Sequence, residues 1–233
     1  MFPGRFTPND VDVYTPETEE TLMLEILREQ LGFTVTKQVA TAYPKRLSIT
    51  RIYWLTKGTA KINLITVKGD NAVVPIFQFH STLVMNKISC YGMFCAYPEL
   101  TLNGIALVNT GVKLDTYSKR RTAECIEKYE KRGFTFKDQL GDYRQFHGHR
   151  CGENANCQKS VRTLGDGQGL FVPFTAHTED KEGQTHTTVN TADGTNSVEW
   201  SLGGLSCNGE DFMDGVVNSV TIKSESEGEA KAD

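Results

Sequence analysis

Residues 46–67, RLSITRIYWLTKGTAKINLITV, decide the fold class of this 233-residue chain. Apolar side chains alternate imperfectly with polar ones over Arg46–Leu55 and again over Ala60–Val67, which is the pattern of half-buried strands. The TKG sequence between the two runs is typical of a turn. Beyond a second turn, Ala72–Phe79 is a third run of residues that favour strands. Three strands with short connections predict an antiparallel meander.

Helices are predicted on both sides of this meander. Over 16–31 a proline at the first position follows a capping threonine, and acidic residues suit the positive end of the helix dipole. The apolar spacing of 83–93 fits a short helix better than a strand, and 116–132 is rich in strong helix formers. Further strands are expected to end near 108 and to cover 170–174, 197–202 and 216–223. Because strands and helices do not alternate strictly, the sequence predicts an α+β fold, with a mostly antiparallel sheet, two or three helices and a long polar loop.

Length and composition indicate one folded domain. We expect an extended N-terminal lead-in over 1–15, a single α+β domain over 16–223 and a disordered acidic tail over 224–233. Hydrophobic residues make up 38% of the chain and charged residues 23%, which is typical of a globular protein.

Charge and hydropathy exclude two classes of partner. The net charge of −4 gives no attraction to nucleic acid or to anionic membranes. No apolar run approaches the ~18 residues that cross a bilayer, and the N-terminus lacks the pattern of a secretory signal. The sequence therefore predicts a cytoplasmic or nuclear protein whose partner is an unknown protein or small ligand.

The polar, glycine-rich stretch 138–169 holds the highest concentration of reactive groups, in the sequence HGHRCGENANC. Histidine and cysteine are the usual ligands of zinc, and the candidates in this stretch are His147, His149, Cys151 and Cys157. Thiolate and neutral imidazole suit tetrahedral zinc, although the cysteines are wider apart, and the histidines closer, than in common zinc motifs. Cys125 or Cys207 could complete such a site from a distance. A loop of about thirty residues is uncommon unless it is functional, disordered or held in place.

Other interpretations of this loop remain open at this point. The histidines and cysteines could be unrelated, or Cys151 and Cys157 could form a disulfide, which a reducing compartment disfavours. A catalytic metal would need an open coordination position and a nearby base such as Glu153 or Asp166.

Two further patterns carry weaker signals. Cys90 with His80, or Cys157 with His177, could form nucleophilic pairs if they met in space, but an apolar setting favours core packing for Cys90 and a core role for His80. The glycines of 165–169 precede a strand rather than a helix, so they predict a turn and not a phosphate-binding loop.

A series of short motifs occurs in fixed order along the chain. They are HSTLVMN at 80–86, FCAYP at 94–98, CIEKYEKRGF at 125–134, CQKSVR at 157–162 with Asp166, and WSLGG at 200–204 with Cys207. Over roughly 70–210 the series resembles a large, expanded group of uncharacterised intracellular proteins of mushroom-forming fungi. The resemblance implies a single intracellular domain in many paralogous copies and no established activity. It also implies that the Cys125 and Cys157 positions recur while the histidines vary, which weakens the four-ligand set, and it transfers no catalytic residue.

The leading hypothesis is a noncatalytic intracellular binding protein. Its loop 138–169 would be braced by a structural zinc through Cys151, Cys157 and either His147 or His149. The alternative is a metal-assisted or thiol-based hydrolase whose chemistry lies in the same four residues.

Overall fold

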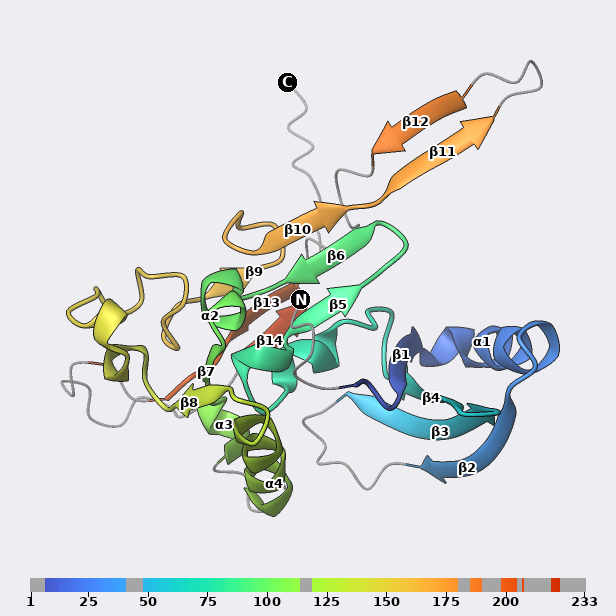
Figure 1. Ribbon diagram of the computed structural model, residues 1–233, viewed down its shortest axis with the longest axis horizontal. Coiled ribbons are helices and arrows are strands. Elements are labelled where there is room, and N and C mark those ends of the chain that lie inside the picture. Colours follow the sequence, from blue (N-terminus) through green and yellow to red (C-terminus); the bar gives the residue numbers. More distant parts are fainter. Residues whose placement is uncertain are drawn as a thin grey trace, which may run out of the picture. The chain divides into compact units, whose positions relative to one another are not determined.

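The computed structural model describes residues 7–40, 48–113, 119–179, 185–189, 198–204, 207 and 219–222. The chain divides into two compact units, residues 1–78 and residues 79–233 (Figure 1). The start of the predicted lead-in, residues 1–6, and the predicted tail over 224–233 lie outside the described residues.

The first unit is built on a four-stranded sheet with the strand order β1-β4-β3-β2 (Figure 1). Its strands are β1 (Val11–Pro16), β2 (Thr34–Ala40), β3 (Ile49–Lys57) and β4 (Ala60–Val67). The strands β2, β3 and β4 pair antiparallel, and β3 turns into β4 at Gly58, whose φ of 56° favours glycine. The predicted hairpin is therefore confirmed. The predicted lead-in contains a strand, because β1 pairs in parallel with β4.

A continuous helical segment follows β1, as the sequence predicts for 16–31. It consists of a 3₁₀ turn at Glu17–Glu19, α1 (Glu20–Glu25) and a π-helical turn at Ile26–Gln30. The expected threonine cap is wrong: Thr15 is a buried residue of β1, and no side-chain cap is formed at Pro16.

The helical segment covers one face of the sheet. Leu27 packs there against Tyr53, Leu55 and Leu64, each at most 5% exposed. At the edge of this core, Tyr53 Oη donates to Glu20 Oε1 at 2.7 Å, and the same carboxylate pairs with Arg51. The buried apolar side chains and the hydrogen bond and ion pair of Glu20 together hold the helical segment on the sheet.

Two local predictions are wrong. Ala72–Phe79 contains a 3₁₀ helix at Val74–Gln78 instead of a third hairpin strand, since Pro75 cannot donate to a strand ladder. The predicted helix at 83–93 is a 3₁₀ turn at Thr82–Val84 followed by two short strands, β5 (Asn86–Ile88) and β6 (Gly92–Cys95). Short apolar runs do not distinguish helix from strand, and pairing with a distant strand decides here.

The described residues of the second unit, residues 79–233, form several small sheets and three α-helices. Its antiparallel sheets have the orders β10-β6-β5 and β14-β13-β9, beside the hairpin β11–β12, while β7 and β8 pair in parallel. The remaining strands are β7 (Ile105–Leu107), β8 (Thr135–Lys137), β9 (Arg162–Thr163), β10 (Leu170–Pro173), β11 (Thr175–Glu179), β12 (Thr185–Val189), β13 (Val198–Ser201) and β14 (Ser219–Ile222). The helices are α2 (Pro98–Leu102), α3 (Thr110–Lys113) and α4 (Lys119–Glu130).

These elements confirm the α+β class and the predominance of antiparallel pairing. The helix α4 and the strands β10, β13 and β14 fall within their predicted ranges. The described strands form five sheets and not the single sheet that the sequence predicts. The described residues contain four α-helices, more than the two or three predicted, because α2 and α3 are additional short helices of about one turn. The single-domain boundary of 16–223 remains a prediction.

A buried arginine organises the core of the second unit. The Arg162 guanidinium lies 5.0 Å from the Tyr97 ring and 5.4 Å from the Trp200 ring, and its side chain is 2% exposed. It pairs with Asp166 and donates to the carbonyl oxygens of Ala155 and Ala96. A buried charge with this many partners is stable. The end of the long loop is thereby fixed to the core.

Candidate metal centre

The loop between β8 and β9 is held by buried aromatic and aliphatic side chains. Leu140 and Phe146 lie on two 3₁₀ turns, Tyr143 lies between these turns, and all three are at most 7% exposed. The Tyr143 hydroxyl lies 2.8 Å from the carbonyl oxygens of both Ala106 and Thr135, which belong to neighbouring strands. Burial raises the pKa of Tyr143 to about 12, so the hydroxyl remains a hydrogen-bond donor at neutral pH.

A tight turn then orients the two histidines differently. The His149 N–H donates to the Phe146 carbonyl at 3.2 Å, with His147 (φ −61°, ψ 130°) and Gly148 (φ 76°) at the corners. These are the angles of a type II turn, which needs glycine at its second corner. His147 at the first corner is exposed, while His149 is partly buried.

The His149 ring is held in one orientation. Its Nδ1 lies 2.9 Å from the Phe146 carbonyl oxygen, which can only accept, so in the neutral imidazole Nδ1 carries the proton and Nε2 has the free lone pair. Nε2 is buried and has no hydrogen-bond partner among the described residues. A buried acceptor without a partner costs about 1–3 kcal/mol. A metal ion would satisfy it, and a backbone carbonyl on the other nitrogen is the usual support for a ligating histidine.

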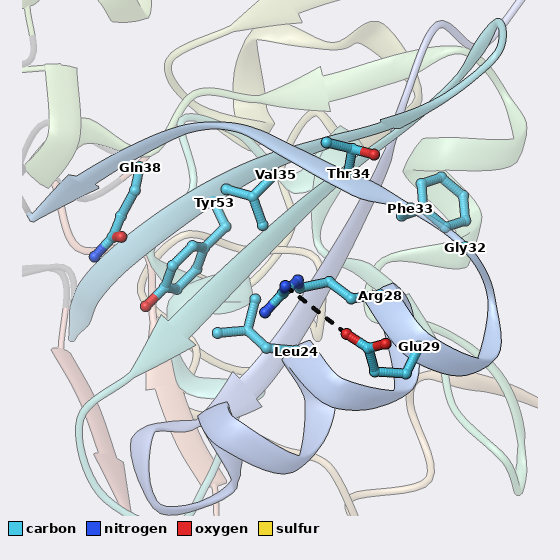
Figure 2. Close-up of a pocket in the computed structure, with 9 residues that line it drawn as sticks. All are labelled: Leu24, Arg28, Glu29, Gly32, Phe33, Thr34, Val35, Gln38 and Tyr53. Atoms are coloured by element: carbon cyan, nitrogen blue, oxygen red, sulfur yellow. Dashed lines mark ion pairs between the residues drawn. The ribbon is translucent and has the colours of Figure 1, made fainter.

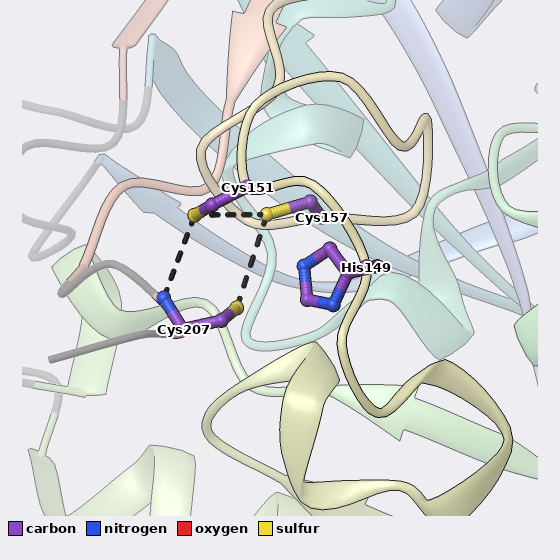
Figure 3. Close-up of side chains that lie close together, drawn as sticks. All are labelled: His149, Cys151, Cys157 and Cys207. Atoms are coloured by element: carbon purple, nitrogen blue, oxygen red, sulfur yellow. Dashed lines mark hydrogen bonds between the residues drawn. The ribbon is translucent and has the colours of Figure 1, made fainter.

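Three cysteine sulfurs lie together on one side of this imidazole (Figure 3). Cys151 Sγ lies 3.6 Å from Cys157 Sγ, which lies 3.9 Å from Cys207 Sγ. Tetrahedral zinc with Zn–S bonds of about 2.3 Å places neighbouring sulfurs about 3.8 Å apart. The four ligand atoms, including the histidine nitrogen, all lie within 4.8 Å of one another. His149, Cys151, Cys157 and Cys207, hereafter the ligand group, can therefore hold a metal ion.

Hydrogen-bond donors point at the sulfurs. The Cys207 N–H donates to Cys151 Sγ at 3.4 Å, and Gln158 Nε2 donates to Cys207 Sγ at 3.0 Å. Gln158 is fully buried, and its Oε1 accepts the Leu140 N–H. Such donors stabilise thiolates and fix their positions.

Burial suppresses the ionisation of the Cys157 thiol. Burial is the main cause that raises its pKa to about 12, and the backbone N–H groups of Gly152 and Lys159 oppose this only in part. Without a cation the thiol stays protonated at neutral pH, whereas a coordinated metal would deprotonate it.

The structure brings together three of the four predicted ligands and adds a fourth. His149, Cys151 and Cys157 belong to the ligand group, and Cys207 completes it from 50 residues further along the chain. His147 is outside the group because the turn directs it to solvent, and Cys125 lies on α4. The sequence analysis names Cys125 and Cys207 as residues that could complete the site from a distance, and the fold selects Cys207.

Two of the alternative interpretations fit poorly with this geometry. All six cysteines are free, and the shortest sulfur distance far exceeds a disulfide bond of about 2.05 Å. The two proposed bases are engaged elsewhere: Glu153 pairs with Arg150 at the surface, and Asp166 pairs with Arg162. Partial burial raises the pKa of Asp166, but hydrogen bonds from Arg162 and from backbone amides outweigh it, so the pKa lies below its ordinary value.

Of the other candidate residues, His80 and Cys90 have different surroundings. His80 lies against Tyr129, with ring centroids 5.8 Å apart, and burial with the nearby Lys128 charge lowers its pKa to about 4. Cys90, predicted to pack in a core, is exposed in the turn between β5 and β6. The side chain of His177 lies outside the described residues.

The first unit has a groove of about 620 Å³ between its helical segment and β2 (Figure 2). Its charged residues, Arg28 and Glu29, pair with each other at 3.8 Å and are more than half exposed. The hydroxyl of Tyr53, on the groove wall, is bonded to Glu20. Polar groups therefore do not converge in this groove as they do in a ligand site.

Comparison with known proteins finds no similarity: no family model, no curated protein and no solved structure matches this chain. Within the described residues, every helix is too short or too polar to cross a lipid bilayer.

Proposed function

We propose that the protein binds one zinc ion through the ligand group as a structural site, and that it is a noncatalytic protein that acts through binding. The observation that carries the proposal is the buried, unpartnered Nε2 of His149 beside three free sulfurs. Soft thiolates and a neutral imidazole select zinc over hard cations such as magnesium or calcium.

The number of protein ligands supports a structural role. A catalytic zinc keeps one position open for water, whereas four protein ligands close the tetrahedron. Glu153 and Asp166, the two bases considered for a catalytic metal, form ion pairs with Arg150 and Arg162, and neither belongs to the ligand group. We also propose that the protein is cytoplasmic or nuclear, because free thiols persist in these reducing compartments.

Zinc would act as a link between distant segments. Three ligands lie within nine residues of the long loop, while Cys207 follows β13. A metal bond between them would add to the packing of Leu140, Tyr143 and Phe146 and would link the loop to the segment after β13.

The test is the metal content of untagged protein purified under reducing conditions and measured by elemental mass spectrometry. We expect one zinc per chain in the wild type and almost none in His149→Ala or Cys207→Ser. Cobalt substitution should give the absorption of a tetrahedral, thiolate-rich site in the wild type only.

Matched controls come from the same chain. His147→Ala removes an imidazole two residues away, and Cys90→Ser removes an exposed thiol. Both variants should keep full zinc content. Wild-type protein that neither contains nor takes up zinc would contradict the proposal, as would equal losses in His147→Ala and His149→Ala.

A further inference from the structure

The sheet β10-β6-β5 of the second unit has an apolar face that is exposed to water. The outer face of an antiparallel sheet is ordinarily polar. Here six large apolar side chains are 38–73% exposed: Ile88, Tyr91, Met93, Leu170, Val172 and Phe174. More than half of the large exposed apolar residues of the described chain belong to this set, hereafter the apolar face.

Strand register places these side chains together. Ile88 pairs with Met93, which pairs with Val172, so the three form one row across the sheet. Leu170 lies two residues before Val172 and therefore on the same face. Next to this row, beyond the pair Pro173–Gly92, the Phe174 N–H donates to the Tyr91 carbonyl at 2.9 Å. The six side chains thus lie on the same side of the sheet.

The opposite face of the same sheet packs inward. Phe94 alternates with Met93 along β6 and is only 5% exposed. A Cβ atom at Gly169 would lie 2.5 Å from the Phe94 ring, and one at Gly92 would lie 2.8 Å from the Phe171 ring. This tight packing fixes which face turns outward.

We propose that the apolar face pairs with the same face of a second copy of this chain in a twofold dimer. None of the six side chains is charged, and Lys87, which pairs with Phe94, belongs to the opposite face. Two copies can therefore pack face to face without bringing like charges together, as in an isologous interface.

The exposed area fits a weak dimer. At these exposures the six side chains leave roughly 500 Å² in water, within the range of about 300–600 Å² for the largest patch on a monomer. Face-to-face pairing would bury roughly 1,000 Å², which is the lower limit for a specific interface. A lipid surface is a poorer occupant, because the chain has a net charge of −4 and the face has no basic residues for anionic headgroups.

The test is sedimentation equilibrium of the full chain over two decades of concentration. We expect a concentration-dependent dimer for the wild type. Ile88→Lys and Val172→Lys should each raise the dimer Kd at least tenfold, because a lysine at the centre of the interface would be buried opposite its own copy. Both sites are at least 40% exposed in one chain, so the monomer fold should tolerate the change, and circular dichroism checks this.

Val161→Lys and Leu102→Lys are the controls, since these residues are 64% and 50% exposed but lie outside the sheet. Their dimer Kd should match the wild type. A wild type that stays monomeric at every concentration would overturn the proposal. Another protein, or another segment of the chain, would then be the partner of the apolar face. Dimers that persist in both face variants, or that weaken equally in the controls, would overturn it as well.

Discussion

At the scale of single residues, Arg162 has the largest predicted effect on stability. Its guanidinium is enclosed by two aromatic rings and bonded to Asp166 and two carbonyl oxygens. Arg162→Ala removes these contacts and leaves the partly buried Asp166 carboxylate without its cation. We expect the free energy of unfolding to fall by about 3–5 kcal/mol, as measured by urea denaturation.

The control for this prediction is Arg120→Ala. Arg120 pairs with Glu124 on the surface of α4, and its side chain is 92% exposed. Such a pair contributes about 0.5 kcal/mol at most. Similar losses in the two variants would show that the enclosure of Arg162 contributes nothing beyond a surface ion pair.

The two neighbouring histidines show the limit of sequence analysis at this scale. Both are zinc-ligand types, and their spacing does not separate them. The type II turn at Gly148 exposes His147 and aligns His149 with the Phe146 carbonyl. Composition therefore identified the candidates, and backbone dihedral angles selected between them.

At the scale of elements, the pairing of β6 with β10 depends on Gly92. A Cβ atom there would contact the Val172 carbonyl oxygen and the Phe171 ring. Gly92→Ala should therefore lower the free energy of unfolding by about 3 kcal/mol. Gly167→Ala is the control, because Gly167 has a φ of 70° and open space around it, so only backbone strain of about 1 kcal/mol is expected. Thermal denaturation of both variants measures the difference, and equal losses would contradict the close approach.

Elements set by local chemistry were predictable. The β3–β4 hairpin and α4 follow from alternation and helix propensity within a few residues. The strands β5 and β6 were predicted as a helix, and β1 as an unpaired lead-in. For β1 and β6 a pairing partner lies far along the chain, in β4 and in β10, so no local window contains it.

At the scale of the whole molecule, the ligand group belongs to one of the two compact units. If zinc holds this unit, a strong chelator should speed hydrogen exchange in 140–166 and in β13. The β3–β4 hairpin of the other unit contains no ligand and should keep its protection. Exchange mass spectrometry with and without chelator measures both in one experiment. Uniform acceleration, or none, would contradict a local structural role for the metal.

By itself the sequence determined the α+β class, the hairpin over 49–67, the helix α4 and the loop that holds three of the four ligands. These features depend on residues close together in the chain, where periodicity, propensity and ligand chemistry are directly visible. Only the tertiary structure decided that Cys207 joins the ligand group and that His147 does not. It also decided that six apolar side chains gather on one sheet face. Strand pairing brings together residues that the sequence separates by tens of positions, and no local pattern encodes that proximity.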